Sequence, residues 1–461
     1  MLARAAILSR MMTGLTIVVA AVLLAAPLET SAEDRDKAKP ETRKVQAVGE
    51  WAYKRLNAAH EALAKSKHAE ALQALEEMKG SSRLNEHEKA LMWQTYGYVY
   101  ASQEKYKQAT EAFEKCLEAG GLPETAQLDT QYNLGQLYVM LERFDDAVRV
   151  LQDWFANAQN PSAEAHYVYA VALYQKGDKR NALQQGELAV QKATKPQEAW
   201  LQLVLSLYID NQQYPKAIEV CEALTAYFPK KAYWLQLSAV YSQVDDYKRA
   251  LAALAVANAQ GMLTEDRELT HLAQLYLYNE IPYEAGRLLD DGLASGKVEG
   301  TAQSWRLLSE AWVSARERTK AEKPLEQAAS KSGDGELYVR LAQIQFERED
   351  WGAVSKSLRH ALEKGKLVDP GGAQLLLGIA SVKDKKWEQA RTAFKAAAGF
   401  EKNRRSAEQW LTEVDAEVGE AAATSAAVGA AAESSGGGGS APPAAPPEKV
   451  EAPSGSGKGG V

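Results

Sequence analysis

The sequence predicts an all-α protein, a right-handed superhelical solenoid of about ten helical hairpins stacked in a row. Two observations predict this fold. A pattern of small and apolar residues returns about every 35 residues along most of the chain, and no stretch of strand length alternates between apolar and polar residues. Hydrophobic residues make up 46% of the chain, which is enough to build one continuous core.

The repeat is clearest in a small residue of the first helix and in an alanine of the second. The first position is occupied by Gly97, Gly135, Ala170, Leu205, Ser238, Ala273, Ser309, Ala342 and Gly378. The second is occupied by Ala109, Ala147, Ala182, Ala217, Ala250, Ala285, Ala321, Val354 and Ala390. Because Leu205 and Val354 are larger than the others, we expect wider or differently packed contacts there.

The spacing within one repeat explains why hairpins would stack. Residues three and four apart share a face of a helix, so Trp93, Gly97 and Tyr100 form one stripe. Ala109 and Phe113 form a facing stripe on the next helix. A single hairpin cannot bury such a stripe alone, so its neighbours must cover it.

This arrangement resembles the tetratricopeptide repeat, whose signature is W-x2-L-G-x2-Y followed by A-x3-F. Here the segment reads Trp93-x2-Tyr96-Gly97-x2-Tyr100 and then Ala109-x3-Phe113. A weaker unit with Ala59 and Ala71 precedes it, so the repeats extend from about Trp51 to Gly399. The resemblance implies a scaffold that binds other proteins.

The two ends of the chain differ from the repeats in composition. Residues 1–32 have Arg4 and Arg10, an apolar stretch from residue 14 to residue 28, and small residues before Ala32. This pattern is typical of a cleaved secretory signal, and the alternative is an uncleaved anchor in the inner membrane. We expect a charged segment at 33–50, the solenoid at 51–400, a capping helix at 401–419 and a disordered Ala/Gly/Ser/Pro-rich tail at 420–461. No segment after the signal is apolar enough to span a membrane, so the predicted location is the periplasm.

Charge and cysteine content limit the possible partners. The formal net charge is −7, so the chain lacks the basic surface that nucleic acid requires. Cys116 and Cys221 fall three repeats apart on second helices, so we expect two buried thiols rather than a disulfide.

No motif points to catalysis, to a cofactor or to a metal. The six histidines are dispersed over different repeats. His60-Glu61 begins like a zinc-binding helix, but Ala64 occupies the place of the second ligand. We therefore predict a protein that is not an enzyme and needs no cofactor. The alternative from another class is an enzyme with a site in the groove of the solenoid.

Off-signature residues of the first helices would line the inner concave wall of such a solenoid. Aromatic and amide side chains there suit a peptide or a partner helix, although they could equally form an ordinary polar surface. The candidate residues are Gln94, Tyr98, Tyr132, Gln136, Tyr167, Tyr174, Gln202, Gln274, Arg306, Glu310 and Gln343.

Several segments resemble a narrower group of proteins. Among them are Tyr233-Trp234-Leu235-Gln236-Leu237-Ser238 and Pro282-Tyr283-Glu284-Ala285. They are similar to periplasmic tetratricopeptide proteins associated with TonB–ExbB–ExbD systems, and the likeness covers most of residues 41–416. The resemblance implies an accessory role in TonB-dependent uptake. The alternative is a scaffold for cell-wall or outer-membrane assembly.

Overall fold

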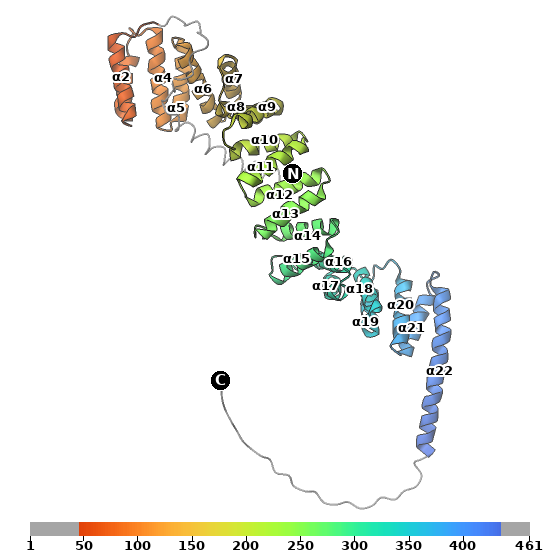
Figure 1. Ribbon diagram of the computed structural model, residues 1–461. Helices are drawn as coiled ribbons and strands as arrows, with labels where there is room; N and C mark the ends of the chain where they lie inside the picture. Colours follow the sequence, from red (N-terminus) through yellow and green to blue (C-terminus); the bar gives the residue numbers. More distant parts are fainter. Residues whose placement is uncertain (1–45, 435–461) are drawn as a thin grey trace, which may run out of the picture. The chain divides into compact units, whose positions relative to one another are not determined.

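The structure is a computed structural model that describes residues 46–434, with side chains described up to residue 419. All regular structure in this range is helical and no strand occurs within it, so the predicted all-α fold is confirmed. The chain divides into two compact units, one ending at Leu263 and one beginning at Thr264 (Figure 1). The expected signal, most of the charged segment and the end of the tail lie outside the described residues.

The first unit consists of six antiparallel helical hairpins. Its helices are α2 (Glu50–Ala64), α3 (His68–Lys79), α4 (Glu86–Ser102), α5 (Tyr106–Ala119), α6 (Glu124–Met140), α7 (Phe144–Asn157), α8 (Ala163–Lys176), α9 (Lys179–Lys192), α10 (Glu198–Asp210), α11 (Tyr214–Tyr227), α12 (Lys231–Gln243) and α13 (Tyr247–Ala259). Even-numbered helices are the first helices of their hairpins, and odd-numbered helices are the second.

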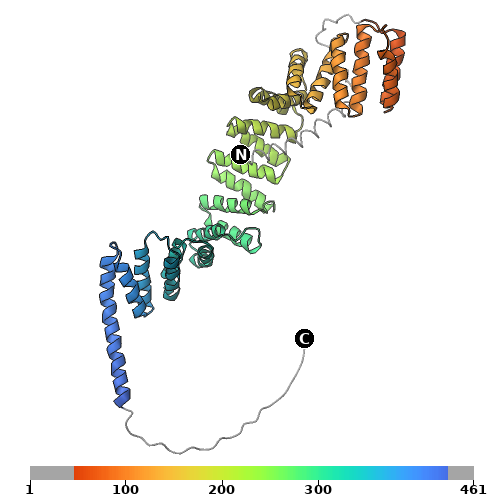
Figure 2. The same ribbon diagram turned by 180° about the vertical axis from the view of Figure 1, so that it is seen from behind.

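The second unit consists of four hairpins and a long final helix. Its helices are α14 (Asp266–Tyr278), α15 (Pro282–Ala294), α16 (Ala302–Ser314), α17 (Arg318–Lys331), α18 (Glu336–Glu347), α19 (Trp351–Lys364), α20 (Pro370–Lys383), α21 (Trp387–Ala398) and α22 (Arg404–Ser434). Figure 2 shows α22 beside α21 and continuing beyond it. The helix extends past residue 419, the expected end of the capping helix, through an alanine-rich sequence that favours helix.

Every hairpin turns at the same place in the repeat. The turn residue follows the small residue by seven places and adopts a left-handed backbone conformation, with φ of 58° at Glu104 and 92° at Gly177. The amide after it donates to a carbonyl five residues earlier, as from Lys105 to Tyr100 at 2.9 Å. The ten turn residues are Ser66, Glu104, Glu142, Gly177, Gln212, Asp245, Glu280, Arg316, Glu349 and Lys385. Ten hairpins are therefore present among the described residues.

In most hairpins the small residue fits against a large one sixteen places later, whereas Gly186 occupies that place opposite Ala170. A Cβ atom at Gly97 would lie 2.4 Å from Phe113 Cε1, and one at Gly135 would lie 2.6 Å from Leu151 Cδ2. Leu205 is the exception in size, and the same register places the small, buried Cys221 opposite it. The volumes of the two positions therefore compensate one another.

Serine hydroxyls of two first helices bond to the second helices, and two second helices carry a buried thiol. Ser238 Oγ donates to the carbonyl of Ala250 at 2.9 Å, and Ser309 Oγ donates to that of Ala321 at 3.1 Å. Cys116 and Cys221 are both buried and both free. Their predicted state as separate thiols is confirmed.

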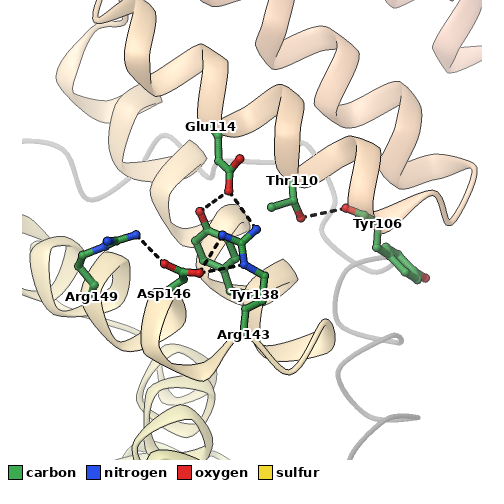
Figure 3. Close-up of polar contacts among 7 residues, drawn as sticks. All are labelled: Tyr106, Thr110, Glu114, Tyr138, Arg143, Asp146 and Arg149. Atoms are coloured by element: carbon green, nitrogen blue, oxygen red, sulfur yellow. Dashed lines mark hydrogen bonds and ion pairs between the residues drawn. The ribbon is translucent and has the colours of Figure 1, made fainter.

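Neighbouring hairpins are joined by an aromatic–carboxylate contact, shown in Figure 3 for α5 to α7. The Tyr138 hydroxyl donates to Glu114 Oε1 at 2.7 Å, and Arg143 Nη1 lies 3.1 Å from the same oxygen. The Arg143 guanidinium also lies 4.5 Å from the centre of the Tyr138 ring. One tyrosine thus meets a carboxylate from the preceding hairpin and a cation from its own.

This contact recurs with changes of residue type. In α10 the Tyr208 hydroxyl donates to Glu187, which also accepts from Lys216 at 3.0 Å. In α16 the Trp312 Nε1 atom donates to Asp290 Oδ2 at 3.0 Å. Each set fixes the spacing of two successive hairpins within its unit.

Candidate protein-binding surface

The first helices of the first unit lie next to one another and share side-chain contacts. Gln94 Nε2 of α4 donates to Thr130 Oγ1 of α6 at 2.9 Å. Asn133 Nδ2 of α6 donates to the Tyr98 hydroxyl of α4 at 3.3 Å. The surface formed by α4, α6, α8 and α10, carrying Gln94, Tyr98, Asp129, Tyr132, Glu164, Tyr174 and Gln202, is called the first-helix face below.

Two tyrosines of this face are held by aromatic packing. Tyr98 is 36% exposed, and its ring meets Phe113 edge to face at 5.3 Å. Tyr132 is half-buried and stacks on Trp154 at 5.0 Å. Rigid aromatic side chains lose little conformational entropy when they bind a partner, which favours their use in recognition.

Carboxylates lie close to both rings. Burial raises the pKa of Tyr98 to about 12, and the charge of Asp129 adds to this shift. Burial also raises the pKa of Tyr132 to about 12, with a further contribution from Glu164. Both phenols are therefore neutral at physiological pH. Asp129 and Glu164, whose charges contribute to these shifts, are both exposed.

The far end of the face is ordered by a polar network. Gln202 of α10 hydrogen-bonds to the hydroxyl of Tyr233 of α12, which in turn donates to Glu198. Lys230 Nζ lies 2.5 Å from the same carboxylate. The Gln202 amide is therefore fixed in direction before any partner arrives.

The structure places the eleven candidate residues in different surroundings. Tyr98, Gln274, Arg306 and Gln343 are exposed, and Gln94, Tyr132, Tyr174, Gln202 and Glu310 are half-buried. Gln136 and Tyr167 are buried, with 4% and 3% of their surface exposed. Tyr167 is covered because its ring stacks on Trp200 of the next first helix at 5.3 Å.

The candidates fall into two groups. Seven belong to the first unit, and Gln274, Arg306, Glu310 and Gln343 belong to α14, α16 and α18 of the second. In the second group Arg306 Nε pairs with Glu310 Oε1 at 3.0 Å, so their charges largely cancel. The first group, with its tyrosines and amides, is the better candidate surface.

Sequence reasoning missed Asp129 and Glu164. Each lies three residues before a tyrosine of the same helix, Tyr132 and Tyr167 respectively, and so shares its face. The helical spacing could have revealed them. The adjacency of Asp129 to Tyr98 across two helices could not be read from the sequence.

Nothing in the part of the chain that the structure describes is arranged for metal chemistry. No three histidine, cysteine or carboxylate side chains of residues 46–419 converge as metal ligands. The histidines are engaged elsewhere: His87 Nδ1 lies 2.7 Å from the carbonyl of Gly121, and His166 Nδ1 lies 2.7 Å from Gln185 Oε1. Among the described helices, none has the length and apolar character needed to cross a membrane.

Comparison with known proteins gives two matches to family profiles, both described as tetratricopeptide repeat. They cover residues 88–160 and 132–199. No curated protein matches the chain.

Solved structures of low sequence identity are also similar. A tetratricopeptide repeat protein from Parabacteroides merdae is 15% identical, covers 65% of this chain and 100% of its own, and has a TM-score of 0.34. YrrB, described as a tetratricopeptide protein with an unusual peptide-binding site, is 18% identical over 40% of this chain and 88% of its own, with a TM-score of 0.33. The TPR2AB domain of yeast Sti1, in a complex with pHSP90, is 15% identical over 57% of this chain and 99% of its own, with a TM-score of 0.33.

Proposed function

We propose that this chain, whose residues 88–199 match tetratricopeptide repeats, is a non-enzymatic scaffold that binds a protein partner in the bacterial cell envelope. The single observation that carries the proposal is the first-helix face. Its tyrosines and amides come from successive helices and are held in place by contacts between them. Such a surface is preorganised, so little conformational entropy is lost when a partner binds.

The finer part of the proposal is an accessory role in a TonB-type energy-transduction or uptake system. It is supported by the resemblance of most of residues 41–416 to periplasmic proteins of that kind, and by the signal-like sequence of residues 1–32. The periplasm is the proposed location. An uncleaved signal would instead anchor the same scaffold to the inner membrane.

A crosslinking experiment in cells tests the binding role. The full chain, tagged at its carboxyl end, is expressed in its host, crosslinked and purified from the envelope fraction. We expect one set of envelope proteins to be recovered, including components of the TonB system. Recovery of cytosolic proteins alone would refute the envelope role.

A pair of matched variants tests the surface. Tyr98→Ala removes an exposed ring from the first-helix face, and Tyr227→Ala removes one that is 61% exposed on the second helix α11. We expect the first change to reduce recovery of the partner and the second to leave it unchanged, with thermal unfolding of both variants measured alongside. Equal recovery by the two folded variants would exclude the first-helix face as the binding surface.

A further inference from the structure

Four aromatic rings form a continuous row across α6, α7 and α8 of the first unit. The Tyr132 ring stacks on Trp154 with centroids 5.0 Å apart, and Trp154 meets Phe155 edge to face at 5.0 Å. Phe155 in turn stacks on Tyr169 at 4.9 Å. All four side chains are half-buried, so each keeps part of its surface open to solvent. These four residues are called the aromatic row below.

The packing of a hairpin does not require two of these rings. Trp154 lies seven places after Ala147, and Tyr169 lies one place before Ala170. At the place of Trp154 the nine other hairpins have a smaller, buried residue, namely Met78, Cys116, Ala189, Leu224, Ala257, Gly292, Ala328, Ala361 and Ala397. At the place of Tyr169 seven hairpins have a buried leucine or valine, namely Leu134, Val204, Leu237, Leu272, Leu308, Leu341 and Leu377. The exposed surface of the aromatic row is therefore additional to what the repeat needs.

The aromatic row also carries a hydrogen-bond donor. The Trp154 Nε1 atom makes no hydrogen bond within the described residues and is not enclosed by them. Surfaces lined with aromatic rings bind proline-rich segments in the polyproline II conformation. Such a segment has no internal hydrogen bonds, so its carbonyls are free to accept from an indole N–H.

The chain contains a segment with this chemistry. Residues 441–447 read Ala-Pro-Pro-Ala-Ala-Pro-Pro and carry no charge, and they follow α22 outside the described residues. Pro443 and Pro446 are the only two prolines of the chain that are three residues apart. Because polyproline II has three residues per turn, these two prolines would face the same way in that conformation. Proline has little backbone freedom to lose on binding, since its ring fixes φ near about −65°.

We propose that residues 441–447 of this chain bind the aromatic row, with Pro443 and Pro446 against its rings and a carbonyl of the segment accepting from Trp154 Nε1. An uncharged, proline-rich segment thereby meets a row of uncharged rings. Because Tyr132 also belongs to the first-helix face, the bound segment competes with a protein partner for that face. The inference goes beyond the scaffold function and does not depend on it.

Amide hydrogen exchange of the full chain tests the contact. The wild type is compared with a four-proline variant that carries Pro442→Ser, Pro443→Ser, Pro446→Ser and Pro447→Ser. We expect exchange in α6, α7 and α8 to be at least about threefold faster in the variant, because the segment no longer holds these helices together. Exchange in α18 and α19 of the second unit should be unchanged. Equal exchange of α6, α7 and α8 in the two proteins would overturn the proposal.

A labelled peptide of residues 439–449 identifies the occupant. Its fluorescence anisotropy is measured with the wild-type chain and with the four-proline variant, beside a peptide that has serine at the same four places. We expect the proline peptide to bind the variant at least about fivefold more tightly than the wild type, because the wild-type segment competes with it. The serine peptide should bind neither protein. Equal binding of the proline peptide to both chains would mean that the aromatic row accepts proline-rich segments of other proteins but not its own, and would overturn the proposal.

Two matched substitutions in the four-proline variant locate the site. Trp154→Leu removes the central ring of the row, and Trp51→Leu removes a tryptophan of α2 that is 41% exposed. Leucine already occupies the place of Trp154 in α11, as Leu224, so the hairpin tolerates it. We expect Trp154→Leu to weaken binding of the proline peptide about tenfold and Trp51→Leu to change it less than twofold, with circular dichroism confirming that both fold. Equal losses in the two folded proteins would exclude the aromatic row as the site.

The two proposals fail independently. Exchange and peptide binding are measured on the pure chain, so a negative result there leaves the recovery of an envelope partner untouched. A chain that recovers no envelope partner, but whose four-proline variant exchanges faster in α6, α7 and α8, would refute the scaffold function and retain the contact.

Discussion

The substitution Gly378→Ala tests the packing rule that defines the hairpin. Gly378 lies in the middle of α20, and a Cβ atom there would be 2.4, 2.5 and 2.7 Å from three carbons of the Phe394 ring. The ring is fully buried and is stacked on Trp410 of α22, with centroids 5.7 Å apart. It therefore cannot move away from the new methyl group without disturbing the next helix.

The expected magnitude follows from two opposing effects. Replacing glycine by alanine inside a helix stabilises it by about 1 kcal/mol. Overpacking a filled core costs about 1–3 kcal/mol, and the overlap with three ring atoms places this site at the upper end of that range. We expect a net loss of about 1–2 kcal/mol in the free energy of unfolding of the second unit.

The control is a glycine of the same unit with open space around it. A Cβ atom at Gly352, in the first turn of α19, would meet nothing closer than Asp350 Oδ1 at 3.9 Å. Gly352→Ala should therefore raise stability by up to about 1 kcal/mol. Urea unfolding followed by far-ultraviolet circular dichroism measures both, and amide hydrogen exchange assigns the effect of Gly378→Ala to α20 and α21.

The same substitution in a Phe394→Leu variant tests whether overlap with the ring causes the loss of stability. With leucine in place of Phe394, an alanine at residue 378 would face a leucine at residue 394. The chain already has this combination at Ala342 and Leu358. Introducing Gly378→Ala into the Phe394→Leu protein should then be neutral or stabilising. If it destabilises that background as much as the wild type, steric overlap with the ring is not the cause and the packing rule is wrong.

Three further outcomes are expected. Tyr138→Phe removes the hydroxyl that meets Glu114 and should cost about 1 kcal/mol in urea unfolding of the first unit; no loss would show that the contact does not stabilise the hairpin stack. Burial raises the pKa of Glu187, but hydrogen bonds from Tyr208 and Lys216 outweigh this and hold it below its usual value of 4.5. Because the folded-state pKa is lowered, this stabilisation is present above pH 4.5 and is lost as the pH falls through the folded-state value. The acid unfolding of Glu187→Gln should therefore depend less steeply on pH than that of the wild type. Glu104→Gly places glycine where φ is 58° and should stabilise the turn by about 0.5–1 kcal/mol, measured by thermal unfolding; a loss would mean that the left-handed conformation carries no strain.

The sequence by itself determined the fold and the repeat. The small residue, the alanine of the second helix and the polar turns are local signals, and each lies within one hairpin. Because a repeat protein adds units of similar pattern, the local signals of one hairpin predict the helices of the others. The left-handed turn at Glu104 and its equivalents was not predicted, since only Gly177 among the ten turn residues is a glycine.

Only the tertiary structure decided which side chains reach the surface. Tyr167 and Tyr98 both belong to the predicted groove, but Tyr167 is covered by Trp200 from the next hairpin while Tyr98 remains exposed. Likewise, the charge of Asp129 acts on the pKa of Tyr98 only because α6 and α4 are neighbours in the fold. Exposure and charge pairing depend on contacts between hairpins. These contacts are set by side chains of different repeats, which a repeat pattern leaves free to vary.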